Sequence, residues 1–76
     1  MKIDPNSIDY IFGQNLRKIR EGLGMSQMEF ADLCDISTAY YGRVELGLHS
    51  LTISRCYKIS QALGKRLADL FEDLVE

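Results

Sequence analysis

The stretch SQMEFADLCDISTAYYGRVELG, residues 26–47, predicts two short helices joined by a tight turn. Ser26 and Glu29 form a capping box, in which each side chain can satisfy a backbone N–H at the start of the first helix. Asp35 tolerates the left-handed conformation better than most residues, and Ser37 is a suitable cap for a new helix. We therefore expect the turn to lie at Asp35 and the second helix to start at Ser37.

Apolar spacing divides the side chains of these two helices into an inward and an outward set. Those expected to face the core are Phe30, Ala31, Cys34, Tyr41 and Val44. The side chains of the second helix that are expected to point away from the core are Thr38, Ala39 and Arg43. Gly47 is expected to stop the second helix in the left-handed conformation that often follows a helix C-terminus.

The size and composition of the chain limit the classes of protein it can belong to. Seventy-six residues make a single domain, residues 1–76. A domain this small buries only about 60% of its unfolded surface, so we expect modest stability unless it oligomerises. No apolar run is long enough for a membrane helix or a signal peptide, and we expect a cytoplasmic chain without a membrane partner.

The sequence offers little for metal binding or catalysis. Cys34 and Cys56 both fall on predicted apolar faces, and we interpret them as small buried hydrophobes in a reducing cytosol. Together with the lone His49 they supply too few ligands for a metal ion. No cofactor or small-molecule ligand is expected. An enzymatic function is the weakest possibility, because the sequence shows no nucleophile–base pair and no acidic dyad.

An N-terminal arm and a basic amphipathic helix precede the capping box. Residues 1–7 lack periodicity and form the arm, and Asn6 or Ser7 is the expected cap. The helix is expected over roughly residues 8–21. Its core-facing residues, at three/four spacing, are Ile8, Ile11, Phe12, Leu16 and Ile19. The basic cluster near its C-terminus, which suits the helix dipole, is Arg17, Lys18 and Arg20.

Two further helices are expected after residue 51. Thr52 caps a helix that runs to about Leu63 and is ended by Gly64. Its inward residues are Ile53, Cys56, Ile59, Ser60 and Leu63. Residues 65–76 are expected to form a short amphipathic fifth helix. Its apolar residues are Leu67, Leu70, Phe71, Leu74 and Val75.

These five large apolar residues exceed what one side of a small core needs. We therefore expect residues 65–76 to be a dimerisation helix that meets a second copy of the chain. The alternative is a helix that only covers the core of its own chain.

The chain resembles the phage-repressor type of helix-turn-helix protein, the Cro/XRE-like family of bacterial transcriptional regulators. The residues that carry the resemblance are Leu16-Arg17, Ile19-Arg20, Gly24-Met25-Ser26-Gln27, Phe30-Ala31, Ile36-Ser37, Val44-Glu45, Gly47, Ile59, Ala62-Leu63-Gly64, Leu67 and Leu70-Phe71. No single tripeptide is specific, but the ordered series with its spacing is. The resemblance implies an all-α, compact five-helix, lambda-repressor-like DNA-binding domain with the helix-turn-helix at helices 2 and 3.

The resemblance also implies which residues meet double-stranded DNA. The third helix, about residues 38–46, is expected in the major groove with its N-terminal residues nearest the bases. Arg43 can contact guanine through two hydrogen bonds, which is worth about 1–3 kcal/mol of discrimination. Thr38 can meet a base edge, and Ala39 can meet a thymine methyl. The expected phosphate contacts are Arg17, Gln27, Ser37, Tyr40 and Ser50.

Three of these assignments depend on position or residue type. Gln27 follows the cap of the second helix, and a helix N-terminus suits a phosphate. Tyr40 is expected to reach the sugar-phosphate backbone through its hydroxyl. His49, next to Ser50, is left open between a solvated loop residue and a phosphate ligand.

In the resembled family, an arginine at the position of Arg20 pairs with a glutamate at the position of Glu45. The pair is expected to tie the first helix to the third and to present the reading helix rigidly. The alternative is an exposed ion pair worth under about 1 kcal/mol.

The loop LGLHSL, residues 46–51, lacks the Asn-Pro often found in the family. Its continuation Leu51-Thr52-Ile53 is similar to controller proteins of restriction-modification systems.

Two functions remain after this reading. The first is a sequence-specific DNA-binding transcriptional regulator, acting as a homodimer on twofold-related half-sites about 34 Å apart. The alternative is a helical protein-interaction module that retains the fold without DNA binding. The net charge of −2 motivates this alternative, because DNA affinity depends largely on phosphate neutralisation. The positions of Arg17, Gln27, Thr38 and Arg43 favour DNA.

Overall fold

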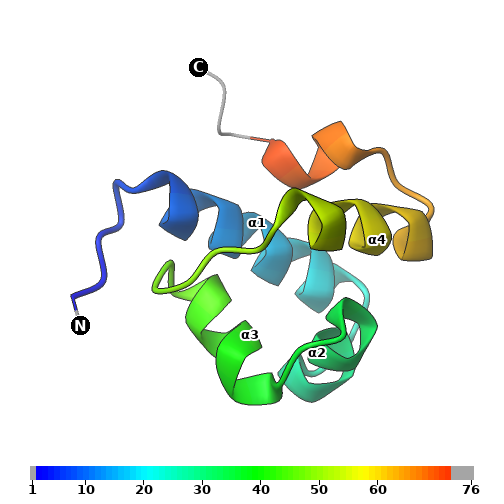
Figure 1. The fold of residues 1–76 in the computed structure, drawn as a ribbon, viewed down its shortest axis with the longest axis horizontal. Coiled ribbons are helices and arrows are strands. Elements are labelled where there is room, and N and C mark those ends of the chain that lie inside the picture. The colour runs from blue at the N-terminus through cyan, green and yellow to red at the C-terminus, as the bar shows by residue number, and fades with distance from the viewer. Residues whose placement is uncertain (1, 73–76) are drawn as a thin grey trace.

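The computed structural model describes residues 2–72, which form four α-helices and a closing 3₁₀ helix (Figure 1). In chain order they are α1 (Ile8–Gly22), α2 (Gln27–Cys34), α3 (Thr38–Glu45), α4 (Ile53–Leu63) and η1 (Leu67–Phe71). No strand occurs within residues 2–72, so the described part of the fold is all-α as expected. The count of five α-helices is not confirmed, because only the short 3₁₀ helix occupies the described part of residues 65–76.

Side-chain caps set the starts of the α-helices. Ser7, Ser26, Ser37 and Thr52 each accept a hydrogen bond from the backbone N–H three residues later. The capping box at Ser26 is complete, since its own backbone N–H donates to the Glu29 carboxylate at 2.9 Å. The turn after α2 also forms as predicted: Asp35 is left-handed, with φ 61°.

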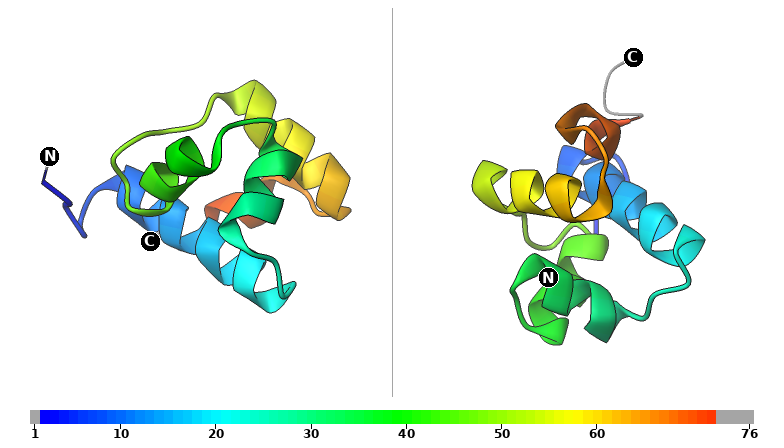
Figure 2. Two further views of the ribbon diagram at one scale, coloured as in Figure 1. Left: turned by 90° about the horizontal axis from the view of Figure 1, so that it is seen from below. Right: turned by 90° about the vertical axis from the view of Figure 1, so that its right-hand side faces the viewer.

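The five helices pack around a small core. α2 and α3 contact each other, and α1 contacts both α3 and η1 (Figures 1 and 2). α4 contacts α2 and η1, so the contacts between elements form a closed ring. The fully buried apolar side chains come from all five elements: Leu16, Phe30, Tyr41, Val44, Ile59 and Leu70. None of the helices within residues 2–72 has the length and apolarity to cross a membrane.

Two residues expected in the core lie at the surface. Ile8 and Ile53 are each 69% exposed. Each is the first residue of its helix, directly after the cap, and lies beyond the edge of the core. The expectation from helical spacing was wrong at both positions because spacing does not mark where the packed part of a helix begins.

One residue of the expected dimer interface is corrected. Leu70 is fully buried in the core of its own chain and offers no surface to a second copy. Leu67 and Phe71 are half-buried against that core, and the Phe71 ring stacks on Phe12 with centroids 5.1 Å apart. Leu74 and Val75, the other expected interface residues, lie outside the described residues. The dimer interface expected at Leu67 and Phe71 stays a prediction, because both side chains keep some exposed surface.

α3 docks on α1 with its backbone in direct contact. A Cβ on Gly13 would overlap the carbonyl oxygens of Val44 and Glu45. A Cβ on Gly47, which has φ 76° as predicted, would lie 2.6 Å from the Cα of Tyr10. Only glycine permits this approach, so these two positions set how closely the end of α3 sits on the first helix.

Candidate nucleic-acid interface

One face of α3 is exposed along its length. Thr38, Ala39 and Arg43 are all exposed, as the spacing predicted. Beside them lies a hollow of about 380 Å³ that α1, α2 and α3 share. Its lining residues are Gln14, Arg17, Arg20, Gln27, Ala39, Gly42, Arg43, Glu45 and Leu46.

A buried carboxylate lies beneath this hollow. Glu45 is only 3% exposed. Arg20 donates to it twice, from Nε to Oε2 at 2.7 Å and from Nη2 to Oε1 at 3.3 Å. The Tyr41 hydroxyl donates to Oε2 at 2.5 Å, and the Gln27 amide donates to Oε1 at 2.9 Å. The carboxylate therefore connects α1, α2 and α3 at one point.

The electrostatics of this cluster keep Glu45 ionised. Burial acts to raise the pKa of Glu45, but hydrogen bonds from Arg20, Tyr41 and Gln27 outweigh it and hold the pKa below its ordinary value. The hydrogen bond to Glu45 in turn raises the pKa of Arg20. The Arg20 and Glu45 side chains are 13% and 4% exposed, so the structure contains a mostly buried ion pair rather than the exposed alternative.

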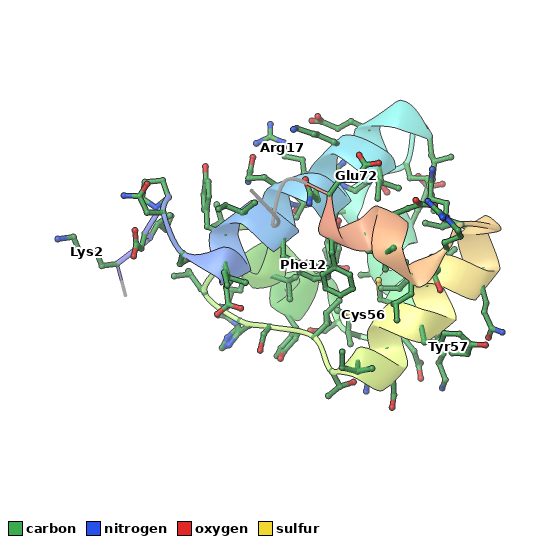
Figure 3. The ribbon with its side chains drawn as sticks, turned by 90° about the horizontal axis from the view of Figure 1, so that it is seen from above. Lys2, Phe12, Arg17, Cys56, Tyr57 and Glu72 are labelled. Carbon is green, nitrogen blue, oxygen red and sulfur yellow. The ribbon has the colours of Figure 1, made fainter. Side chains whose placement is uncertain are left out.

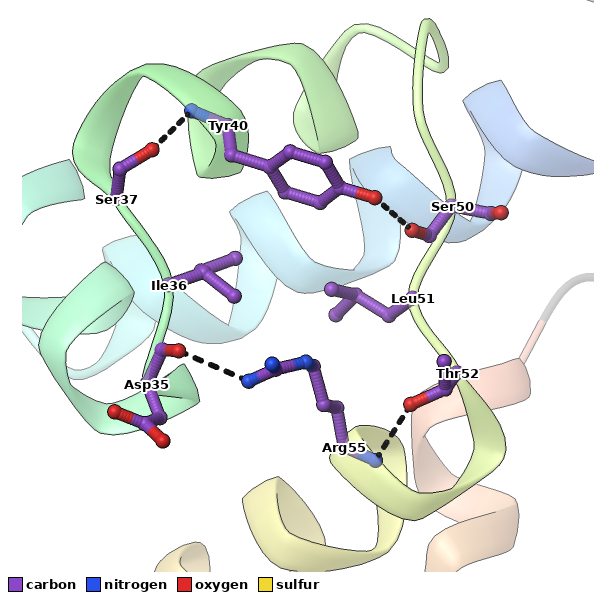
Figure 4. Close-up of a pocket in the computed structure, with 8 residues that line it drawn as sticks. All are labelled: Asp35, Ile36, Ser37, Tyr40, Ser50, Leu51, Thr52 and Arg55. Atoms are coloured by element: carbon purple, nitrogen blue, oxygen red, sulfur yellow. Dashed lines mark hydrogen bonds between the residues drawn. The ribbon is translucent and has the colours of Figure 1, made fainter.

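The five expected phosphate contacts fall into two groups that flank the exposed face of α3. Arg17 and Gln27 line the hollow described above. Arg17 pairs with Glu21 at 3.2 Å on the exposed surface of α1, and Figure 3 shows it at the outside of the molecule. Ser37, Tyr40 and Ser50 line a second hollow of about 420 Å³ (Figure 4).

In the second group, Tyr40 braces the loop after α3. Its hydroxyl donates to the Ser50 carbonyl at 2.9 Å, and its ring stacks on His49 with centroids 4.8 Å apart and planes within 6° (Figure 4 shows the hydrogen bond). The hydroxyl thus already has a partner within the chain. Ser37 accepts from the Tyr40 backbone N–H at 3.1 Å, which leaves the Ser37 O–H as a donor.

The sequence profile described as Helix-turn-helix matches residues 16–70, which is more than half of the chain. The chain belongs to the Cro/XRE-type helix-turn-helix family. It is therefore a DNA-binding transcriptional regulator, as the resemblance implied.

Relatives of this helix-turn-helix regulator include two controllers that match over nearly their whole length. Control protein C.MunI of a Mycoplasma species is 37% identical over 70 residues, covering 91% of this chain and 95% of that protein. The crystal structure of the restriction-modification controller protein C.AhdI from Aeromonas hydrophila superimposes with a TM-score of 0.77 at 32% identity, covering 90% of this chain and 99% of that one. The similarity to controller proteins drawn from Leu51-Thr52-Ile53 is thus confirmed.

A third relative is longer. The uncharacterized HTH-type transcriptional regulator RP497 of Rickettsia prowazekii (strain Madrid E) is 26% identical over 69 residues, which cover 91% of this chain but 53% of that protein. All three relatives are named as regulators, and none is named as an enzyme.

Several residues that build the site of this helix-turn-helix regulator gave no signal in the sequence. The Gln14 amide donates to the Glu45 carbonyl at 2.9 Å, which holds the end of α3 on α1. Arg55 donates to the carbonyls of Cys34 and Asp35 at 3.1 and 2.9 Å, which ties α4 to the turn (Figure 4 shows the bond to Asp35). Tyr41 was expected in the core and is buried there, but the hydrogen bond from its hydroxyl to Glu45 was not predicted.

The two cysteines are free and buried, as interpreted from the sequence. Burial raises the pKa of the Cys34 thiol to about 12, so it stays protonated and unreactive at neutral pH. Residues 2–72 contain no group of three or more side chains placed to hold a metal ion.

Proposed function

We propose that this protein binds a twofold-symmetric operator as a homodimer and controls transcription of a restriction-modification system. Its similarity to Control protein C.MunI and to the restriction-modification controller protein C.AhdI, over nearly the full length of each, supports this class. The observation that carries the DNA-reading role is the exposed face of α3, with Thr38, Ala39 and Arg43 beside a hollow lined by Arg17 and Gln27.

Base reading follows from the chemistry of that face. α3 enters the major groove, where each base pair presents a distinct pattern of donors and acceptors. Arg43 donates two hydrogen bonds to the O6 and N7 atoms of a guanine. Thr38 offers a hydroxyl to a base edge, and Ala39 offers a methyl group to thymine.

Phosphate contacts on both sides of α3 fix its orientation in the groove. Arg17 and the N-terminal turn of α2 with Gln27 hold one backbone, and the group around Ser50 holds the other. Exposed ion pairs contribute little, so Arg17 can leave Glu21 for a phosphate at small cost. Ser37 and Ser50 donate through their hydroxyls, and Tyr40 acts by bracing the loop.

A second copy of the chain supplies the additional phosphate contacts that one copy needs for tight DNA binding. The net charge of −2 limits the affinity of a monomer for a polyanion. A homodimer doubles the phosphate contacts and places two α3 helices about one helical turn, or 34 Å, apart. Leu67 and Phe71, half-buried against the core, are the expected interface residues that keep some exposed surface.

Selection from random duplex DNA tests this proposal. We expect the wild-type protein to enrich a palindrome and the Arg43→Ala variant to lose that enrichment, because the bidentate guanine contact disappears. Lys58→Ala is the control, since Lys58 is exposed on α4 and no residue of α4 lines the hollow beside α3. A dimer that enriches no sequence at low salt would instead favour the protein-interaction module.

A further inference from the structure

The carboxylate of Glu45 has no spare acceptor site. Each carboxylate oxygen has two lone pairs. Oε2 accepts from Arg20 Nε and from the Tyr41 hydroxyl, and Oε1 accepts from Arg20 Nη2 and from the Gln27 amide. Four donors therefore occupy four sites, and the carboxylate is held in one orientation.

The Tyr41 hydroxyl is itself fixed by the core. The ring is fully buried and packs on Phe30 with centroids 5.2 Å apart. Glu45 follows one turn later on the same helix, so the hydroxyl reaches its carboxylate directly. A phenylalanine at position 41 would keep the buried ring but would leave one lone pair of Oε2 without a donor.

The fixed Glu45 carboxylate determines where the Gln27 amide lies. Its nitrogen bonds to Oε1 of Glu45, and its oxygen lies over Gly42 of α3, 3.6 Å from where a Cβ on that glycine would be. An amide nitrogen carries two hydrogens, so one N–H remains for another acceptor in the hollow next to Arg17.

We infer that Tyr41 is a positioning residue for DNA binding. By occupying Oε2, its hydroxyl leaves Oε1 as the acceptor for Gln27 and so presets the Gln27 amide for a phosphate oxygen. Without the hydroxyl, the amide can bond to either oxygen and the carboxylate can rotate. This inference rests on the proposed phosphate contact of Gln27.

A double-mutant cycle between positions 41 and 27 tests the inference. Tyr41→Phe keeps the buried ring and removes only the hydroxyl. The affinities of wild type, Tyr41→Phe, Gln27→Ala and the double variant are measured for the palindromic duplex recovered by selection. We expect Tyr41→Phe to weaken binding about threefold to tenfold, the worth of one misplaced hydrogen bond. In the Gln27→Ala background the same change should cost less than about twofold, because the effects of coupled residues do not add.

Tyr57→Phe is the matched control. Tyr57 is 52% exposed, and Figure 3 shows it on the opposite side of the molecule from Arg17. Its hydroxyl accepts from Gln61 on the same helix, so we expect unchanged affinity. The side-chain amide NMR signals of Gln27 in the free protein give a second readout, and they should shift in Tyr41→Phe and stay in place in Tyr57→Phe.

The outcomes separate this inference from the proposed function. If Tyr41→Phe weakens binding by the same factor in both backgrounds, Tyr41 acts through general stability and the inference is overturned. Unshifted Gln27 amide signals in Tyr41→Phe overturn it as well, whatever the melting temperature. If Gln27→Ala alone binds DNA normally, the phosphate contact of Gln27 is wrong and the inference falls with it.

Discussion

At the scale of single residues, Glu45 concentrates the interactions that hold the reading helix. A buried charge is tolerated only when it is paired and hydrogen-bonded. Removing one partner of a buried ion pair typically costs about 3–5 kcal/mol, because the other charge is left without compensation. Glu45 meets donors from α1, α2 and α3, so its ionisation state affects the fold at the point where the three helices meet.

The acid sensitivity of the fold should depend on Glu45. Its pKa in the folded protein lies below 4.5, the ordinary value it takes when unfolded. Its stabilising contribution is therefore complete above pH 4.5 and is lost as the pH falls through the folded pKa. We expect the urea midpoint of the wild type to fall more steeply between about pH 5 and about pH 3 than that of Glu45→Gln. Parallel curves for the two proteins would contradict this assignment.

Local signals in the sequence predicted the site in part. The exposure of Thr38, Ala39 and Arg43 followed from helical spacing, because a residue's face depends only on its own helix. The hydrogen bond from Gln14 to the Glu45 carbonyl joins residues 31 positions apart, and the sequence near either residue does not predict it. The close contact of Gly13 with the α3 backbone could not be predicted for the same reason, because the sequence identifies a glycine inside a helix only as a weak helix former.

At the scale of elements, capping and periodicity predicted the four α-helices but not the closing segment. α1 to α4 begin at side-chain caps that the sequence shows directly. η1 is instead shaped by tertiary contacts. The buried amide of Asn15 on α1 donates to the carbonyls of Leu70 and Glu72, which fixes the end of the short helix. This contact crosses 55 residues or more, so the pattern of apolar residues alone could not show that residues 67–71 form a 3₁₀ helix.

The docking of α3 on α1 predicts a large effect of one added methyl group. Gly13→Ala places a Cβ against the backbone carbonyls of Val44 and Glu45. Backbone atoms cannot rotate away as a side chain can, so the whole of α3 must shift away from α1. We expect a loss of about 1–3 kcal/mol and a melting temperature lower by about 4–8 °C for each kcal/mol. Gly22→Ala is the control on the same helix, because its Cβ would meet nothing within 4 Å. Equal melting temperatures for the two variants would show that α1 and α3 do not pack this closely.

At the scale of the whole molecule, function depends on where the charges lie rather than on their sum. The chain is slightly acidic, yet Arg17 and Arg43 both line the hollow on the exposed side of α3. Each phosphate that a cation neutralises releases counterions, so affinity falls with salt at a slope that reports the number of such contacts. The change in slope when Arg17 is removed therefore measures how many copies of Arg17 meet DNA in the complex.

Replacing Arg17 should change that slope by an amount that counts the protomers. Each lost cationic contact makes the log–log slope of affinity against salt less steep by about one, so Arg17→Ala should change it by about two in a homodimer. Lys58→Ala is the control, because Lys58 is an exposed cation on α4, and no residue of α4 lines the hollow beside α3. A change of about one would mean that a single copy meets DNA, since a symmetric dimer must lose the contact at both half-sites. An unchanged slope would remove Arg17 from the interface and leave the acidic chain without its main phosphate contact on α1.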